Sequence, residues 1–320
     1  MLGKLQDSYR SAELVDFFEL MKPRVMRLVI FTASVGMFAA QEYIHPVMAI
    51  ASIILIGLGA GASGALNMWW DADIDAVMER TSSRPVPSGK VKAEDALFFG
   101  VFLSIFSVIF LGLFTNLLAA AILGFTILFY IIVYSMWLKR ATSQNIVIGG
   151  AAGAFPPIIG WAVTTGSIEL ESILMFLLIF VWTPPHFWAL SLFSHSDYRR
   201  AKIPMLTVTH GKAHTRRNIL FYSVALALLS IGISFSPLGG VLYFCAALIL
   251  NGYFLYLATI VYMQNEKSAN KHKMAYERRL FMFSIFYMFF IFGFILLEAL
   301  VDRLGGSFMN IDYSAMLYVI

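Results

Sequence analysis

Asn67, Asp71 and Asp75 follow one another at intervals of four residues in the stretch NMWWDADID. An α-helix with about 3.6 residues per turn places these three side chains on one face and turns Asp73 roughly 200° away from Asp71. Mg²⁺ takes oxygen ligands, commonly one or two carboxylates together with substrate phosphates. The spacing therefore predicts a magnesium-bridged phosphate or diphosphate site. The alternative is a solvated acidic helix end that is balanced by the basic loop after it.

A second acidic position and several basic residues could complete such a site. Asp197 could join the metal shell, and an anionic ligand would need cations of the kind that follow both acidic positions. The candidate diphosphate-binding residues are Arg80, Arg84, Lys139, Arg140, Arg200 and Lys202. Two simpler interpretations remain open at this point. The segment around Asp197 could be an ordinary charged loop, and Lys139 and Arg140 could be anchors at the membrane interface.

His186 lies within an apolar run, directly after Thr183, Pro184 and Pro185. An ionisable residue inside a membrane span is a functional hypothesis by default, and histidine is a common axial ligand of haem iron. The alternative is a hydrogen-bonded core histidine that fills a proline kink. The residues alone do not choose between these two interpretations.

The elements that must position these side chains are membrane helices. Of the 320 residues, 59% are hydrophobic and 13% are charged, whereas soluble domains usually carry about 25% charged residues. Runs of about 20 apolar residues are long enough to span a bilayer. The sequence predicts an all-α bundle of nine spans, which cover residues 24–42, 47–70, 94–113, 117–137, 144–163, 172–193, 217–234, 239–262 and 280–300.

The positive charges give the bundle an orientation. Arg303 is the only Lys or Arg of the 23 that does not lie in one alternating set of loops, 1–27, 71–92, 138–143, 194–217 and 264–279. The positive-inside rule makes this set cytoplasmic, with the N-terminus inside and the C-terminus outside. We expect one membrane-embedded domain over residues 1–320, with a cytoplasmic segment 1–20 and an outside tail 301–320. Acids such as Asp7 and Glu13 argue against a transit peptide and favour a bacterial plasma membrane.

The motifs resemble those of a known family. Asn67-x-x-x-Asp71-x-x-x-Asp75 is similar to the first aspartate motif of the UbiA-type intramembrane prenyltransferases. Longer blocks resemble the haem-farnesylating branch of that family, and together they run from Lys22 to about Gly211. These blocks are NMWWDADID, MERT and RPVPSG after residue 66, LKR, NIVIGG and GAFPP after residue 137, TPPHFWAL after residue 182, and DY, A and IPML after residue 196.

The resemblance implies a reaction between two apolar substrates. Farnesyl diphosphate would be held through Mg²⁺ by Asn67, Asp71, Asp75 and Asp197, and basic residues would take up the charge of the departing diphosphate. The acceptor would be the vinyl group of haem b, and water addition would give haem O. Haem-binding residues would be His186, Tyr134 and Tyr198. Haem A synthase or a terminal oxidase assembly would be partners.

The sequence also departs from the wider family pattern. The second motif often has two acids spaced as Asp-x-x-x-Asp, but here Asp197 is followed by Ala201, as is usual in the haem branch. Lys202 stands where that branch often has Gly. Two alternatives remain: a UbiA-type enzyme with an aromatic-acid or chlorophyll-type acceptor, and a transporter with broken helices around an anionic solute.

Overall fold

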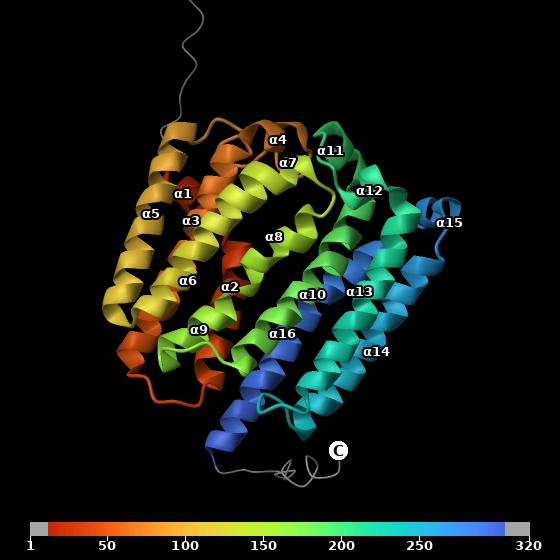
Figure 1. The fold of residues 1–320 in the computed structure, drawn as a ribbon. Coiled ribbons are helices and arrows are strands. Elements are labelled where there is room, and N and C mark those ends of the chain that lie inside the picture. Colours follow the sequence, from red (N-terminus) through yellow and green to blue (C-terminus); the bar gives the residue numbers. More distant parts are fainter. Residues whose placement is uncertain (1–11, 305–320) are drawn as a thin grey trace, which may run out of the picture.

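The computed structural model describes residues 12–304, and within this range the chain is helical, with turns, short connections and no strand (Figure 1). The long helical segments of this range run side by side along one axis. They are α2 (Pro23–Ala39), α3 (Pro46–Trp70), α5 (Ala93–Phe114), α6 with η1 and α7 (Leu117–Ala141), α8 with α9 (Asn145–Thr165), α10 (Leu170–Phe193), α13 (Gly211–Ile233), α14 (Val241–Met263) and α16 (Ala275–Arg303).

These segments coincide with the expected spans. Within residues 12–304, eight of them have at least 18 residues and are apolar enough to cross a bilayer. The ninth, α2, has 17 residues. Large apolar side chains such as Phe98, Ile105 and Leu113 are exposed along the outer face of α5, as expected where lipid replaces water. The chain is a polytopic α-helical membrane protein.

The buried side chains form two main clusters, one in each half of the bundle. The first lies mostly among α10, α13, α14 and α16 and includes Trp188, Tyr287 and Phe292. The second lies mostly among α2, α3, α6 and α9 and includes Ile56 and Ile159. Helix α2 contributes to both clusters, because Val35 belongs to the first and Met37 to the second.

Prolines shape two spans in different ways. Pro156 and Pro157 begin α9 (Pro156–Thr165), which is separated from α8 (Asn145–Ala154) by Phe155 alone. The fourth span is also irregular, because α6 (Leu117–Leu128) continues as the π-helix η1 (Phe129–Leu138) and ends as α7 (Lys139–Ala141). The second span with a proline pair, α10, differs from α8 and α9 because it continues as one helix through Pro184 and Pro185. A wider π-helical turn changes which side chains share a face, and such turns are frequent at functional sites.

Glycines allow α2 and α9 to touch backbone to backbone. A Cβ on Gly160 would overlap the carbonyl oxygen of Ala33, whereas nothing lies within 4 Å of the corresponding position on Gly232. We expect Gly160→Ala to lower the free energy of unfolding by about 1–3 kcal/mol, because backbone atoms would have to move apart. Gly232→Ala in α13 should instead stabilise its helix by up to about 1 kcal/mol. Thermal unfolding in detergent measures both changes. Equal melting temperatures for the two variants would contradict this packing.

Candidate active site

Four short elements gather at one end of the bundle, α4 (Ala72–Val77), α7, α11 (His195–Arg200) and α12 (Leu206–Thr209) (Figure 1). The acidic motif crosses from α3 into α4 at Asp71, whose φ of −91° and ψ of 13° interrupt the regular helix. The Asp71 amide still donates to the Asn67 carbonyl at 2.9 Å, and the Asp75 amide donates to the Asp71 carbonyl at 2.8 Å. These bonds keep the four-residue spacing across the junction.

Asn67 and Asp71 form the buried centre of the site. Their exposed fractions are 4% and 0%. Asn67 Nδ2 donates to Asp71 Oδ2 at 2.7 Å and to Ser135 Oγ at 2.8 Å. Lys139 Nζ lies 2.5 Å from the same Asp71 oxygen. The other oxygen, Oδ1, has no hydrogen-bond partner among residues 12–304, and a buried carboxylate oxygen without a partner is energetically costly.

Asp73 turns away from this centre, as the helical spacing predicts. Its side chain is 64% exposed. Arg140 donates to its two oxygens at 2.7 and 2.9 Å. These bonds hold the pKa of the Asp73 carboxyl below its ordinary value. Arg140 Nη2 also lies 3.8 Å from Asp71 Oδ1, so its charge is shared between the exposed acid and the buried one.

Asp75 and Asp197 each have an arginine partner. Asp75 is 2% exposed, and Arg84 Nη1 lies 2.6 Å from its Oδ2. The backbone carbonyl of Asp75 accepts from Thr81 Oγ1 at 2.9 Å, which fastens the basic loop to α4. Asp197 is 7% exposed and pairs with Arg200.

A buried apolar cluster joins the two acidic elements. Ile74 of α4 and Met78, which follows this helix, pack with Tyr198 of α11 and with Ile203 and Met205 of the segment after it. Burial raises the pKa of the Tyr198 hydroxyl. The charges of Arg80 and Arg84 oppose this rise, while those of Asp197 and Asp75 add to it. Tyr198 therefore lies among charged groups of both acidic positions.

The π-helix η1 places its polar side chains toward Asn67 and Asp71. Ser135 donates from its hydroxyl to the Tyr130 carbonyl at 3.0 Å and accepts from Asn67. Lys139 follows immediately after η1 and reaches Asp71. The ring of Tyr134 lies beside that of Tyr130, with centroids 5.4 Å apart and the ring planes tilted by 34°.

Lys22 belongs to the site although the motif analysis did not select it. It donates from Nζ to Asn67 Oδ1, and its φ of 54° is in the left-handed region. Burial and the nearby Arg84 lower its pKa to about 7, while the charges of Asp75 and Asp71 oppose that shift. The sequence signal was the pair Lys22-Pro23 at the entry to the first span. That pair is equally typical of an interface anchor.

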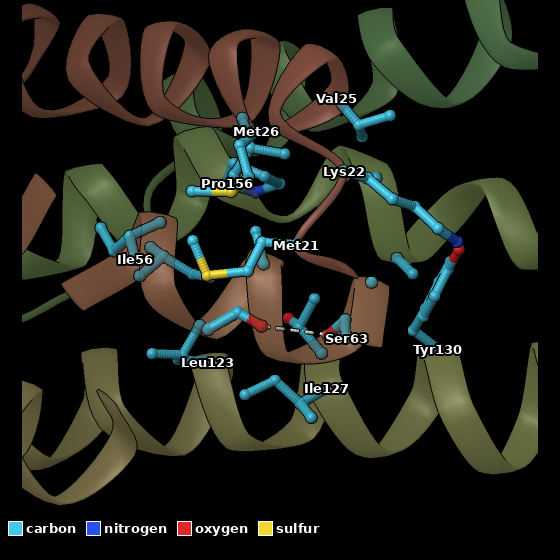
Figure 2. A pocket seen from close by; sticks show the side chains of 18 residues that line it. Met21, Lys22, Val25, Met26, Ile56, Ser63, Leu123, Ile127, Tyr130 and Pro156 are labelled. Atoms are coloured by element: carbon cyan, nitrogen blue, oxygen red, sulfur yellow. Dashed lines mark hydrogen bonds between the residues drawn. The ribbon is translucent and has the colours of Figure 1, made fainter. Parts of the chain in front are cut away.

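An apolar pocket of about 120 Å³ opens next to Lys22. In Figure 2, Lys22 and Tyr130 lie at one end of the pocket, and Ile56 and Leu123 lie toward the other. Its walls come from several helices and are largely free of charge, with Met21, Lys22, Val25, Met26, Val29, Ile56, Gly59, Ala60, Ser63, Gly64, Leu123, Thr126, Ile127, Tyr130, Ala152, Gly153, Pro156 and Ile159. The charged centre therefore adjoins a space suited to a hydrocarbon chain.

The acidic residues suit a hard cation, but they do not form a ready-made metal cage. Among residues 12–304, no group of three His, Cys, Asp or Glu side chains is arranged to hold a metal ion. Asn67, Asp71, Asp75 and Asp197 nevertheless offer oxygen atoms only, which is the chemistry that Mg²⁺ prefers. The unpartnered Oδ1 of Asp71 adds a buried acceptor. These residues fit a cation whose remaining ligands are the phosphate oxygens of a substrate.

Within the part of the chain that the structure describes, two of the expected diphosphate-binding residues, Arg80 and Lys202, are not held by contacts of the kind that fix Arg84 and Lys139. Both are exposed, and their side chains form no hydrogen bond or ion pair within the described range. Lys202 has a φ of 54°, in the left-handed region where glycine has no steric penalty. Lys202 therefore adopts a backbone conformation that favours glycine.

Phe187, the residue after His186, packs against the buried cluster that contains Tyr198. Tyr134 packs against the same cluster. The imidazole of His186 stacks between Trp182 and Phe281, with centroid distances of 4.4 and 4.7 Å. Its Nδ1 lies 2.6 Å from Ser284 Oγ. The side chain is thus held on both faces and at one nitrogen.

The fold and the site agree with one family. The sequence profile of the UbiA prenyltransferase family matches residues 29–285, and the chain belongs to this family. A solved structure of a digeranylgeranylglyceryl phosphate synthase has a TM-score of 0.71 at 18% identity, covering 89% of this chain and 98% of that one. A UbiA homolog from Archaeoglobus fulgidus bound to DMAPP and Mg²⁺ has a TM-score of 0.66 at 12% identity, covering 87% and 99%.

Relatives of much higher identity point to one branch. The protoheme IX farnesyltransferase of Roseobacter denitrificans is 56% identical over 294 residues, which cover 92% of this chain and 94% of that protein. The protein of the same name from Dinoroseobacter shibae is 56% identical over 290 residues, with coverages of 91% and 92%. The resemblance of the sequence blocks to the haem-farnesylating branch is confirmed.

Proposed function

We propose that this protein transfers a farnesyl group from farnesyl diphosphate to the vinyl group of haem b, with addition of water, to make haem O. The relatives that are more than half identical over most of the chain support this assignment. The observation that carries it is the position of Lys22. This residue bonds to Asn67 in the acidic centre and also lines the apolar pocket, so one ligand with a charged head and an apolar tail can occupy both.

The acids and bases have separate roles in this proposal. Asn67, Asp71, Asp75 and Asp197 would hold Mg²⁺, which would supply positive charge to stabilise the departing diphosphate. Lys22, Lys139 and Arg84 each pair with one of these residues, so they lie where phosphate oxygens would be held. Arg140 and Arg200 lie at the rim, where their charge would stabilise the leaving group. Arg80 and Lys202 would do the same from the exposed loops.

The reaction balances without a redox partner. The C–O bond of farnesyl diphosphate breaks, and the diphosphate leaves with the electron pair. The vinyl π electrons of haem b then form the new C–C bond to the allylic cation. Water adds to the resulting cation beside the ring and loses a proton, which leaves a hydroxyethylfarnesyl group. The apolar walls of the pocket would keep water from the farnesyl cation until the vinyl group has reacted.

The hydrogen bonds of His186 suit an iron ligand. The single hydroxyl hydrogen of Ser284 is donated to the Phe281 carbonyl at 2.6 Å. Ser284 Oγ must then accept from Nδ1–H of His186, which leaves the Nε2 lone pair free. We propose that Nε2 ligates haem iron, with Tyr134 and Tyr198 on the side of the diphosphate site.

Ser284→Ala and His186→Ala test this role. Removing the acceptor that orients a ligating imidazole should weaken haem affinity roughly tenfold, and removing the imidazole should weaken it further. Haem titration of the purified protein, followed by its absorption spectrum, measures both affinities. His214→Ala, in α13 and away from these contacts, is the control. An unchanged spectrum and affinity in His186→Ala would leave His186 as a packing residue.

The setting of the enzyme completes the proposal. We place the acidic end of the bundle at the cytoplasmic face of a bacterial inner membrane, in accordance with the Lys and Arg distribution. The whole chain would act as one prenyltransferase domain. Residues 1–11 and 305–320, which include most of the expected outside tail, lie outside the described residues, and α16 extends through Arg303. Haem A synthase or a terminal oxidase assembly would receive the product.

A choice of acceptors tests the proposal. Purified protein with farnesyl diphosphate and Mg²⁺ is given haem b or an aromatic acid such as 4-hydroxybenzoate, and diphosphate release is measured. We expect release that depends on haem b. Release that depends on the aromatic acid would assign the chain to a different acceptor.

A further inference from the structure

A second pocket, lined by several charged residues, lies outside the acidic site at the same end of the bundle. Its volume is about 700 Å³. It lies between α12, the start of α13, the end of α14 and the short helix α15 (Glu266–Lys271), which Figure 1 shows at the same end as α11. The lining residues that matter below are His195, Thr207, Lys212, Arg216, Gln264 and Glu266.

Several residues of this pocket have polar atoms without a partner. Thr207 Oγ1, Arg216 Nε, His195 Nδ1 and Gln264 Oε1 are buried and have no hydrogen bond within residues 12–304. The exposed fractions of Thr207 and Arg216 are 1% and 2%. A buried donor that lacks an acceptor destabilises the fold by about 1–3 kcal/mol. Such a cluster indicates a place that a ligand completes.

The remaining features of the pocket favour an anion. Helix α13 has 23 residues and starts at Gly211 without a side-chain cap, so the first amides of this long helix are available to an acceptor. Lys212 and Arg216 are four residues apart and share a helical face.

A carboxylate from the protein now occupies the centre of this positive region. Glu266 Oε2 lies 2.9 Å from Lys212 Nζ, and its Oε1 lies 2.6 Å from Arg216 Nη1. The side chain of Glu266 is 49% exposed, whereas that of Arg216 is 2% exposed. Glu277 is fully buried and lies 3.2 Å from Arg216 Nη2. Lys212 and Arg216 are therefore fixed parts of the pocket, and the exposed carboxylate of Glu266 is the group that a ligand can displace.

We propose that this pocket is an anion site for a phosphate group, which displaces Glu266 and binds Lys212, Arg216, Thr207 and the first amides of α13. The phosphate would come from the headgroup of an anionic lipid or from a free phosphate. The segment 195–207 supplies Asp197 to the acidic site and also lines this pocket through His195 and Thr207. An occupied pocket would therefore hold in place the chain that supplies the second acidic position. The inference does not depend on the farnesyl acceptor.

Thr207→Val tests the site with little risk to the fold, because the hydroxyl it removes has no partner in the protein. Lys212→Gln removes one charge from the pocket. Lys271→Gln removes an exposed charge from α15 outside the pocket and serves as the matched control. One arm measures the binding of inorganic phosphate to the protein in neutral detergent at fixed ionic strength. The other uses native mass spectrometry on protein from nanodiscs that contain phosphatidylglycerol and phosphatidylcholine.

We expect retained phosphatidylglycerol if the ligand is a lipid, or saturable phosphate binding if the ligand is free. In either arm, Thr207→Val and Lys212→Gln should weaken binding about tenfold, because each removes a hydrogen bond to a charged ligand. Lys271→Gln should bind like the unmodified protein. Absence of specific binding in both arms would overturn the proposal, and so would equal binding by all three variants. Melting temperatures of the unliganded variants show that each is folded.

Discussion

We expect Asp71→Asn to lower the rate of farnesyl transfer about 100- to 1,000-fold, the magnitude typical for loss of a buried group that stabilises developing charge. Asn has nearly the same shape as Asp but lacks the charge that pairs with Lys139 at 2.5 Å. It also replaces one carboxylate oxygen by an amide nitrogen, which cannot bind a cation, in a group whose Oδ1 has no hydrogen-bond partner within residues 12–304. The measurement is single-turnover formation of farnesylated haem by purified protein at saturating farnesyl diphosphate.

Asp73→Asn is the control for this prediction. It changes the same chemical group two residues further along, but the Asp73 side chain is 64% exposed and pairs with Arg140 at the rim. We expect its rate to remain within about tenfold of the unmodified rate, as for removal of a rim charge in a solvated ion pair. Equal losses in the two variants would contradict the assignment of separate faces. Retained turnover in Asp71→Asn would remove Asp71 from the chemistry.

Ala60→Phe blocks the apolar pocket and separates long allylic substrates from short ones. Ala60 lines the pocket on α3, and a phenyl ring there would take space that a farnesyl tail needs. We expect farnesyl transfer to fall about 100-fold, since each displaced CH₂ group forfeits about 0.8 kcal/mol of apolar burial. Binding of dimethylallyl diphosphate should be much less affected, because its tail is shorter and its head is the same. Competition between the two diphosphates measures this difference.

Ala121→Phe provides the matched change on the lipid-facing side of α6, where the residue is exposed. It should leave the preference between farnesyl and dimethylallyl diphosphate unchanged. If Ala60→Phe also leaves that preference unchanged, the farnesyl tail must bind elsewhere, and the acidic site loses its connection to this pocket.

The membrane spans could be predicted well because hydrophobic length is a local property. The expected span 47–70 corresponds to α3 (Pro46–Trp70), and 172–193 corresponds to α10 (Leu170–Phe193). The facing of Asn67, Asp71 and Asp75 was also predictable, since the four-residue hydrogen bonds continue across the junction at Asp71. The roles assigned to these side chains stay predictions.

The contacts between distant segments could not be predicted. Lys22 and Ser135 both bond to Asn67, although they are 45 and 68 residues away along the chain. Ser135 faces Asn67 from a π-helix. Its wider turn changes which residues share a face, so the usual 3.6-residue spacing does not predict this contact. The pocket beside α13 is equally hidden, because Arg216 and Glu266 meet only when α13 and α15 are packed together. No spacing within one segment encodes these pairings.

The most direct test of the central claim is mass spectrometry of the haem product. Purified protein is incubated with haem b, farnesyl diphosphate and Mg²⁺, and the haems are extracted and weighed, with Asp71→Asn in parallel. The account predicts haem that has gained one farnesyl group and one hydroxyl, formed by the unmodified protein and nearly absent with the variant. Recovery of haem b alone after incubation with the folded protein would contradict it.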